Sequence, residues 1–279
     1  MKKDKKASMP SLSTLIEKFS QEDVIAVMEK EYQAAPARLI PTSLIDDTRF
    51  IKDVVLSSDT VNSFASGLKE KGFYNPLIVR PNGERFELIL GRKRFFGAKK
   101  AGILSLPCVV NDVGDEEMLL MLLADTRDNR SSNVLEMALV CNALSSMFGY
   151  TQKTLAELSH FSRSQITNIL RILSLPDDAK NDICLGKLSY GQARTLTSLK
   201  GKQLEYAYKR IMESNMSVRE SEQLVRSILK KEDERSGEDR INVSGLVSLS
   251  IKNKSVSFTF NSVNERDHFL NSLKNNYKN

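Results

Sequence analysis

Tryptophan is absent from this 279-residue chain, and aromatic residues together make up 7% of it. Proteins that hold single-stranded nucleic acid stack its bases on aromatic side chains, so this scarcity argues against that class. Histidine and cysteine are also rare, with two and three copies. Because Cys108, Cys141 and Cys184 lie far apart, they offer no zinc-ligand set, no Cys–His catalytic pair and no disulfide framework. This usage favours a reducing compartment.

Long hydrophobic runs are missing as well. The longest candidate, residues 118–124, is far shorter than the roughly 20 residues that span a bilayer. The N-terminal MKKDKK is basic, but no apolar segment follows it as in a signal peptide. We therefore expect a cytoplasmic protein with no membrane partner. The formal net charge of +6 suits an acidic partner such as nucleic acid.

Composition and periodicity divide the chain into parts that together predict an α+β protein. The predicted parts are a flexible tail with a short amphipathic helix (residues 1–37), a small mixed α/β domain (38–114), a helical domain (115–231), a charge-rich linker (232–240) and a small unit of a β-hairpin and a helix (241–279). The last unit is too small to bury much core alone, so we expect it to dimerise the protein.

Glycine and proline punctuate the predicted elements. In the α/β domain we expect helices over residues 61–71 and 92–101, and strands over residues 76–81, 86–90 and 106–111. An Asn82-Gly83 turn should join the first two strands. The helical domain is expected to break at Pro176, Gly186 and Gly191.

Residues 151–176 have the spacing of a DNA-reading helix-turn-helix. Leu155, Ile166 and Ile169 give the pair of helices a buried face, and polar residues begin the second helix. His160 stands in the turn, at a position that requires positive φ or a relaxed turn. The alternative is an amphipathic helical hairpin with no DNA contact. The expected DNA-binding residues of the motif are Gln152, Ser162, Arg163, Ser164, Gln165, Thr167 and Asn168.

A second segment, residues 187–194, follows the motif by roughly a helix and a turn. Lys187, Ser189 and Arg194 are candidate contacts to a neighbouring stretch of DNA. The alternative is a core helix with Leu188 and Ala193 buried, and both readings can hold on opposite faces.

The start of the helix at residue 92 is a candidate anion site. A strand ends at Gly91 and a helix follows at once, so free N–H groups and the positive end of the helix dipole meet there. Lys93 and Arg94 add positive charge, and a triphosphate would fit. The alternative is a solvated or DNA-facing basic helix.

The order of these features resembles the ParB family of DNA-segregation proteins. The resemblance rests on KGFYNPLIVR (71–80), LILGRKRFFGAKKAG (88–102) and the helix-turn-helix, and it covers about residues 38–230 and, less fully, 241–279. It implies a ParB/sulfiredoxin-like α/β domain and a homodimer on double-stranded DNA with a palindromic site. It also implies a nucleoid-associated role in chromosome or plasmid partition, with a ParA-type ATPase as partner of the N-terminal tail.

The family resemblance further implies a clamp regulated by CTP with Mg²⁺, and it leaves weak CTPase activity open. The nucleotide-binding residues that it implies are Asn75, Pro76, Gly91, Lys93, Arg94, Asp125, Thr126, Asn129 and Arg130. Three positions depart from the family pattern: Arg92 replaces a Glu, Phe96 replaces an Arg, and Asn75 replaces a Gln. The stretch from Asp125 could equally lead to a helix start capped by Asn133.

Two other classes stay open. A helix-turn-helix transcription or nucleoid-occlusion factor without a nucleotide switch would share this scaffold, and Arg92 in place of Glu favours it. A phosphotransferase of the sulfiredoxin type shares the α/β domain, but the box at Gly91 contains no cysteine and a helix-turn-helix follows.

Overall fold

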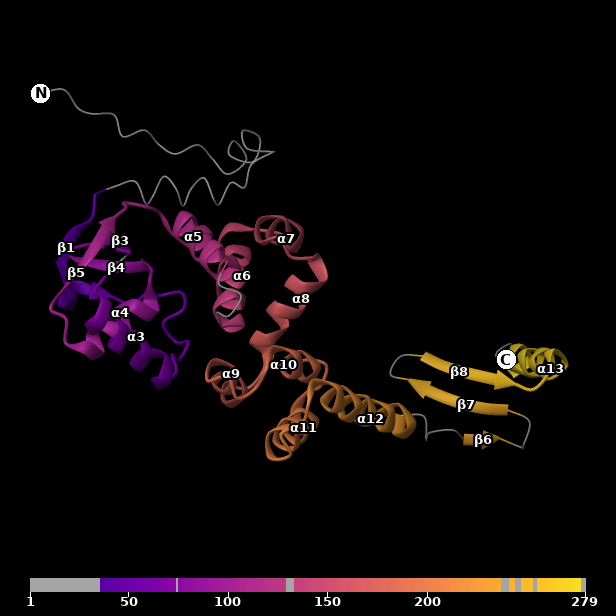
Figure 1. The fold of residues 1–279 in the computed structure, drawn as a ribbon. Coiled ribbons are helices and arrows are strands. Elements are labelled where there is room, and N and C mark those ends of the chain that lie inside the picture. The colour runs from indigo at the N-terminus through magenta and orange to yellow at the C-terminus, as the bar shows by residue number, and fades with distance from the viewer. Residues whose placement is uncertain are drawn as a thin grey trace, which may run out of the picture. The chain divides into compact units, whose positions relative to one another are not determined.

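The fold is that of a computed structural model, which describes residues 36–73, 75–128, 133–236, 241–243, 247–252 and 255–276 (Figure 1). The predicted N-terminal tail, apart from its last two residues, lies outside the described residues. The chain divides into two compact units between Thr197 and Ser198. This division falls inside the helical domain predicted for residues 115–231.

The first unit begins with a five-stranded mixed sheet in the order β1-β5-β3-β4-β2. Its strands are β1 (Arg38–Pro41), β2 (Ile45–Asp46), β3 (Leu77–Asn82), β4 (Arg85–Leu90) and β5 (Ser105–Val110). β3 and β4 form the predicted antiparallel hairpin, but Asn82 pairs with Arg85 as the last residue of β3, so the turn lies one residue later than predicted, at Gly83 and Glu84. β5 pairs parallel to β3 and antiparallel to β1.

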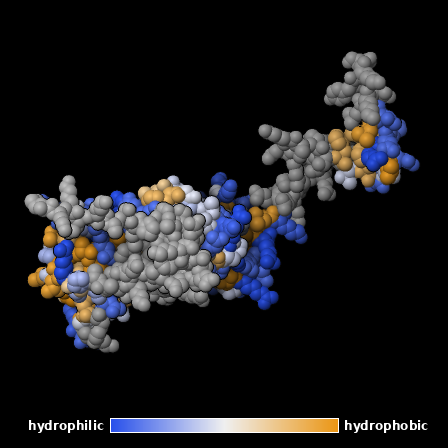
Figure 2. Space-filling model, turned by 90° about the horizontal axis from the view of Figure 1, so that it is seen from above, coloured by the Kyte–Doolittle hydropathy of each residue, from blue (hydrophilic) through white to orange (hydrophobic). Residues whose placement is uncertain are grey.

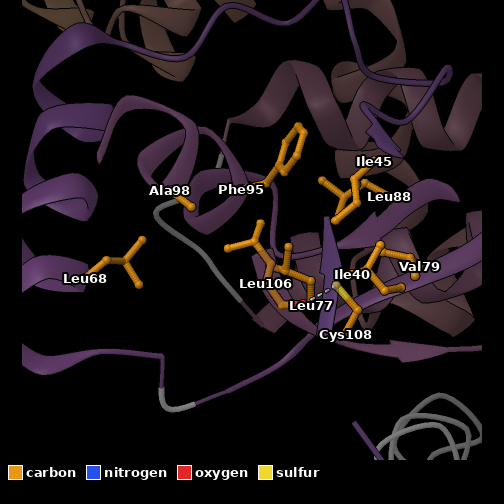
Figure 3. Close-up of a cluster of buried hydrophobic side chains, with 10 residues drawn as sticks. All are labelled: Ile40, Ile45, Leu68, Leu77, Val79, Leu88, Phe95, Ala98, Leu106 and Cys108. Atoms are coloured by element: carbon orange, nitrogen blue, oxygen red, sulfur yellow. Dashed lines mark hydrogen bonds between the residues drawn. The ribbon is translucent and has the colours of Figure 1, made fainter. Parts of the chain in front are cut away.

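Two helices pack against each other and against this sheet: α3 (Ser58–Lys71) and α4 (Arg92–Ala101). Phe95 and Ala98 of α4 enter the core beside Leu77 and Leu106 of the strands (Figure 3). The two helices approach closely at Gly97, where an added Cβ would lie 2.7 Å from the Cβ of Phe64. Gly72 and Gly102 end the two helices with positive φ, as the sequence predicts.

The rest of the first unit is helical. Its helices are α5 (Asp115–Asp128), α6 (Val134–Phe148), α7 (Gln152–Ser159), α8 (Arg163–Arg171), α9 (Asp177–Cys184) and α10 (Tyr190–Leu196). α5 contacts β4, and Arg80 of β3 links sheet and helix through bonds to Glu87 at 2.6 Å and Asp115 at 2.8 Å. α6 then packs on α5 and α8. The prediction of a helix break at Gly191 is wrong: Gly191 is the second residue of α10, and the chain turns earlier, at Gly186.

The second unit contains α11 (Gly201–Glu213) and α12 (Val218–Ser236), which contact each other. Part of the predicted linker is wrong, because α12 continues to Ser236 and makes residues 232–236 helical. Glu and Arg favour helix, so this charged run extends α12. Beyond it lie an antiparallel sheet of β6 (Ile241–Val243), β7 (Val247–Lys252) and β8 (Ser255–Phe260), and α13 (Val263–Asn276).

The predicted hairpin and final helix are confirmed by β7, β8 and α13. The ring of Phe269 on α13 lies 4.7 Å from that of Phe258 and 5.4 Å from that of Phe260, which fixes the helix on β8. Among the described residues, no helix is both long and apolar enough to cross a membrane.

Candidate DNA-reading and nucleotide sites

The helix-turn-helix is built by α7, a short turn and α8, as the sequence predicts. Thr151 caps α7 by accepting the N–H of Thr154, and Ser162 begins α8 in a capping box with Gln165. His160 adopts a left-handed conformation with φ of 56°, so the turn is formed without glycine. The side chains of Leu155 and Ile166 are fully buried between the helices and α6. The motif is therefore well capped and packed, and the exposed residues 162–165 lie at the start of α8.

The polar residues of α8 differ in what they can offer a ligand. The side chain of Gln165 accepts the N–H of Ser162 at 2.8 Å, and the hydroxyl of Ser162 lies 2.9 Å from that of Ser164. Thr167 contacts Gln152 of α7. Among the described residues, the side chains of Arg163 and Asn168 have no hydrogen-bond or ion-pair partner, and that of Arg163 is exposed. These two are thus the best placed of the predicted DNA contacts.

The second predicted DNA segment surrounds the start of α10. Ser189 caps this helix in a capping box with Gln192, and Lys187 lies 3.7 Å from Asp182. Arg194 is exposed on the last turn. Leu188 and Ala193 are buried. The core reading of this segment is therefore confirmed, and DNA contact through its exposed face stays a prediction.

Arg94, which was expected to bind phosphate, folds back over the start of α4. Gly91 has φ of 100°, and an added Cβ there would lie 3.1 Å from a guanidinium nitrogen of Arg94. That guanidinium donates to the backbone oxygens of Asn75 and Pro76, the latter at 3.1 Å. A cavity of about 310 Å³ borders Arg94 and Asn75. Burial lowers the pKa of Arg94, and the charge of Asp125 opposes that effect.

Lys93 faces a different and larger cavity, of about 630 Å³. Lys93 and Arg94 are thus not brought into one pocket. The larger cleft is bordered by the first turns of four helices. The lining residues there are Ser57 and Thr60 at α3, Asn133 and Val134 at α6, Phe161 and Gln165 at α8, and Ser189 and Tyr190 at α10. Helix N-termini and a lysine both favour anions, so this cleft offers groups that suit an anion, and Glu136 also borders it.

The expected motif at Asp125 lies at the end of α5. The side chain of Thr126 borders the larger cleft, but its hydroxyl donates to the backbone oxygen of Leu123. Asn133 caps α6 by accepting the N–H of Leu135, so the capped helix start is confirmed. Asn129 and Arg130 lie outside the described residues. Burial raises the pKa of Glu136 on α6, Arg92 and Lys93 lower it, and Asp125 raises it further.

Arg92 is not part of a solvated basic helix, because its side chain is buried at the base of α4. Its guanidinium lies 2.8 Å from a carboxylate oxygen of Asp47 and 3.5 Å from one of Glu136. It also donates to the backbone oxygens of Val54 and Lys52, at 2.8 and 3.0 Å. Sequence reasoning missed this cluster. The only sequence signal for the cluster was Arg92 itself, which stands where the family pattern has a glutamate.

Comparison with known proteins agrees with this arrangement. The ParB N-terminal domain family matches residues 26–126, and the ParB HTH domain family matches residues 130–230. A probable chromosome-partitioning protein ParB from Pseudomonas putida is 30% identical over 223 residues, which cover 80% of this chain and 73% of that protein. The chain therefore belongs to the ParB family.

Other relatives match over a shorter stretch. The chromosome-partitioning protein Spo0J from Thermus thermophilus is 34% identical over 168 residues, 60% of this chain and 62% of that protein. A solved structure of C-terminally truncated ParB from Caulobacter crescentus, complexed to the centromeric parS site, is 26% identical, covers 68% of this chain and 99% of that one, and has a TM-score of 0.42.

Proposed function

We propose that this protein is a ParB-type partition protein that binds a palindromic double-stranded DNA site as a dimer and acts in chromosome or plasmid segregation with a ParA-type ATPase. The observation that carries the proposal is the helix-turn-helix, in which α8 carries an exposed Arg163 and a half-buried Asn168 on a capped and packed frame. Such a helix lies in the major groove and reads base edges near its N-terminus. Relatives named as chromosome-partitioning proteins support the segregation role.

The test of this function is Arg163→Ala. An arginine that reads guanine bidentately contributes about 1–3 kcal/mol of discrimination, so the variant should bind the selected site about 5- to 150-fold more weakly. Binding to random DNA at low salt should change little, because phosphate contacts supply it. Fluorescence anisotropy with selected and random duplexes measures both.

Lys153→Ala is the matched control, because Lys153 is exposed on α7 and its described partner is Glu157, one turn along the same helix, at 3.9 Å. A loss for Arg163→Ala that is the same on random and selected DNA would contradict base reading. No selected site for the wild-type chain would contradict the proposed function itself.

We further propose that CTP with Mg²⁺ binds at the start of α4 and switches the dimer between a loading and a clamped state. The residues present fit a triphosphate in the larger cleft, because Lys93 and four helix N-termini face it. The charge of Asp125 affects the pKa of both Glu136 and Arg94. The family resemblance makes its carboxylate our proposed ligand for Mg²⁺. When bound, Mg²⁺ would neutralise phosphate charge.

Substitutions on α4 test this proposal. Lys93→Ala and Arg94→Ala should each weaken CTP binding by roughly 1.5–3 kcal/mol, tenfold or more, because each removes a charge-assisted contact. For Arg94, this requires its guanidinium to turn from the oxygens of Asn75 and Pro76 towards phosphate. Lys100→Ala, on an exposed position of the same helix, is the control.

Calorimetric titration with each of the four nucleoside triphosphates, with and without site DNA, measures these affinities. Equal or absent heats for all four would contradict the CTP switch and leave the alternative, a DNA-binding transcription or nucleoid-occlusion factor without nucleotide. DNA recognition would survive that result, because α7 and α8 do not depend on α4 for their caps.

A further inference from the structure

Two polar side chains connect the helices of the helix-turn-helix on its outer side. Gln152 is the first residue of α7, and Thr167 lies in the middle of α8. The hydroxyl oxygen of Thr167 is 2.8 Å from the atom placed as Oε1 in the side-chain amide of Gln152 and 2.9 Å from the backbone oxygen of Arg163. Both side chains are half-buried. The hydroxyl therefore has two close polar neighbours.

A proton count decides how this cluster is bonded. A threonine hydroxyl has one proton, and the backbone oxygen of Arg163 can only accept. Both contacts are satisfied together when Thr167 donates to Arg163 and the amide of Gln152 is turned so that its NH₂ group donates to Thr167. One N–H of Gln152 is then fixed on α8. The other N–H and the amide oxygen stay available at the start of α7.

We infer that Thr167 is a positioning residue, which holds the amide of Gln152 against a phosphate of the DNA backbone. The inference rests on the proposed DNA-binding function. In a helix-turn-helix the first helix crosses the backbone while the second lies in the major groove. Glutamine amides and helix N-termini are common donors to phosphate, and Gln152 supplies both features at once. The Gln152–Thr167 bond thus couples the backbone contact of α7 to the position of α8.

This inference changes the roles of two residues in the polar run of α8. Gln165 and Thr167 were both expected to contact DNA, but Gln165 holds the cap of α8 and Thr167 holds Gln152. Base reading is left mainly to Arg163 and Asn168. A substitution at Thr167 should therefore change affinity without changing which base is preferred at any position.

The experiment uses the full chain and compares Thr167→Val, Thr167→Ser, Gln152→Ala and the Thr167→Val/Gln152→Ala double variant. We measure the affinity for the selected palindrome, the preferred base at each position from a randomised library, and the thermal unfolding midpoint. Thr167→Val and Gln152→Ala should each bind about threefold to tenfold more weakly, the loss of one hydrogen bond. The double variant should be no weaker than Gln152→Ala. Thr167→Ser, which keeps the hydroxyl, should bind like the parent.

Three outcomes would overturn the inference. A changed base preference for Thr167→Val would mean that Thr167 contacts a base edge directly. Additive losses in the double variant would mean that the two residues act independently. A loss in Thr167→Ser equal to that in Thr167→Val, with a lowered unfolding midpoint in both, would mean a purely structural role. Failure of the proposed function gives a different result, since the wild-type chain would then select no site.

Discussion

Arg92→Ala is expected to lower the free energy of unfolding by about 3–5 kcal/mol, the usual cost of removing one partner from a buried ion pair. The side chain of Arg92 is 9% exposed and lies between Asp47 and Glu136, which is itself 10% exposed. The variant would leave two carboxylates without their cation and two backbone oxygens, those of Val54 and Lys52, without a donor. The main cause is that these buried carboxylates and backbone oxygens lose the partner that offset their removal from water. Lost packing contributes less.

The pH dependence of this loss in stability distinguishes an unpaired buried charge from a cavity left by the missing side chain. Burial raises the pKa of Glu136, and the nearby Arg92 lowers it. Removal of Arg92 should therefore raise that pKa further. A carboxyl whose pKa is higher in the folded than in the unfolded state stabilises the fold at low pH and loses that contribution as the pH rises through the folded value. The penalty of Arg92→Ala should accordingly shrink when the pH falls from about 7 to about 5.

Chemical denaturation of the parent, Arg92→Ala and Lys100→Ala at the two pH values is the measurement. Lys100 is exposed on the same helix, and its substitution should change stability by about 0.5 kcal/mol or less. A penalty for Arg92→Ala that stays the same at both pH values would contradict the role of Glu136. A penalty near that of Lys100→Ala would show that the cluster contributes nothing to folding.

The elements around these residues could be predicted because their signals are local. α4 begins after Gly91 and ends before Gly102, as predicted, because both residues have a positive φ that glycine allows. The helix-turn-helix was also predictable, because its caps and its apolar spacing lie within about 20 residues. His160 carries the left-handed turn in place of glycine, which was one of the two conformations that the sequence left open there.

The side-chain partners could not be predicted, because they are set by packing between distant segments. Asp47 and Glu136 lie 45 and 44 residues from Arg92, and nothing in the local sequence links them. Lys93 borders the larger cleft together with residues of α6, whereas Arg94 borders the smaller cavity together with residues of α3. Charge patterns along one helix indicate a cationic site, but they do not say which side chains are already bonded within the protein.

Removal of the C-terminal unit, here the residues after Ser236, should reduce affinity for the palindrome by about 10²- to 10⁴-fold. A dimer holds its second DNA-binding unit close to the second half-site, and a monomer loses that local concentration. A chain that ends at Ser236, where α12 ends, should therefore be a monomer in light scattering at micromolar concentration and should bind one half-site only.

The exposed apolar side chains of this unit support the prediction and allow a gentler test in the full chain. Phe258, Val263 and Leu270 are 41%, 62% and 43% exposed, and hydrophobic surface is visible on this unit in Figure 2. Residues 241–279 are too few to bury these groups without a partner, and a second copy would cover them. Leu270→Glu should then shift the protein to monomers and cause a similar loss of palindrome affinity.

Asn264→Glu, which adds the same charge to an exposed polar position of α13, should leave both properties unchanged. The ring contacts of Phe269 with Phe258 and Phe260 are not touched by either substitution, so the unit should stay folded in both. If the chain ending at Ser236 stayed dimeric, or if Leu270→Glu kept full affinity as a dimer, the dimer interface would have to lie elsewhere. The exposed apolar groups and the proposed palindromic site are independent reasons to expect dimerisation through residues 241–279.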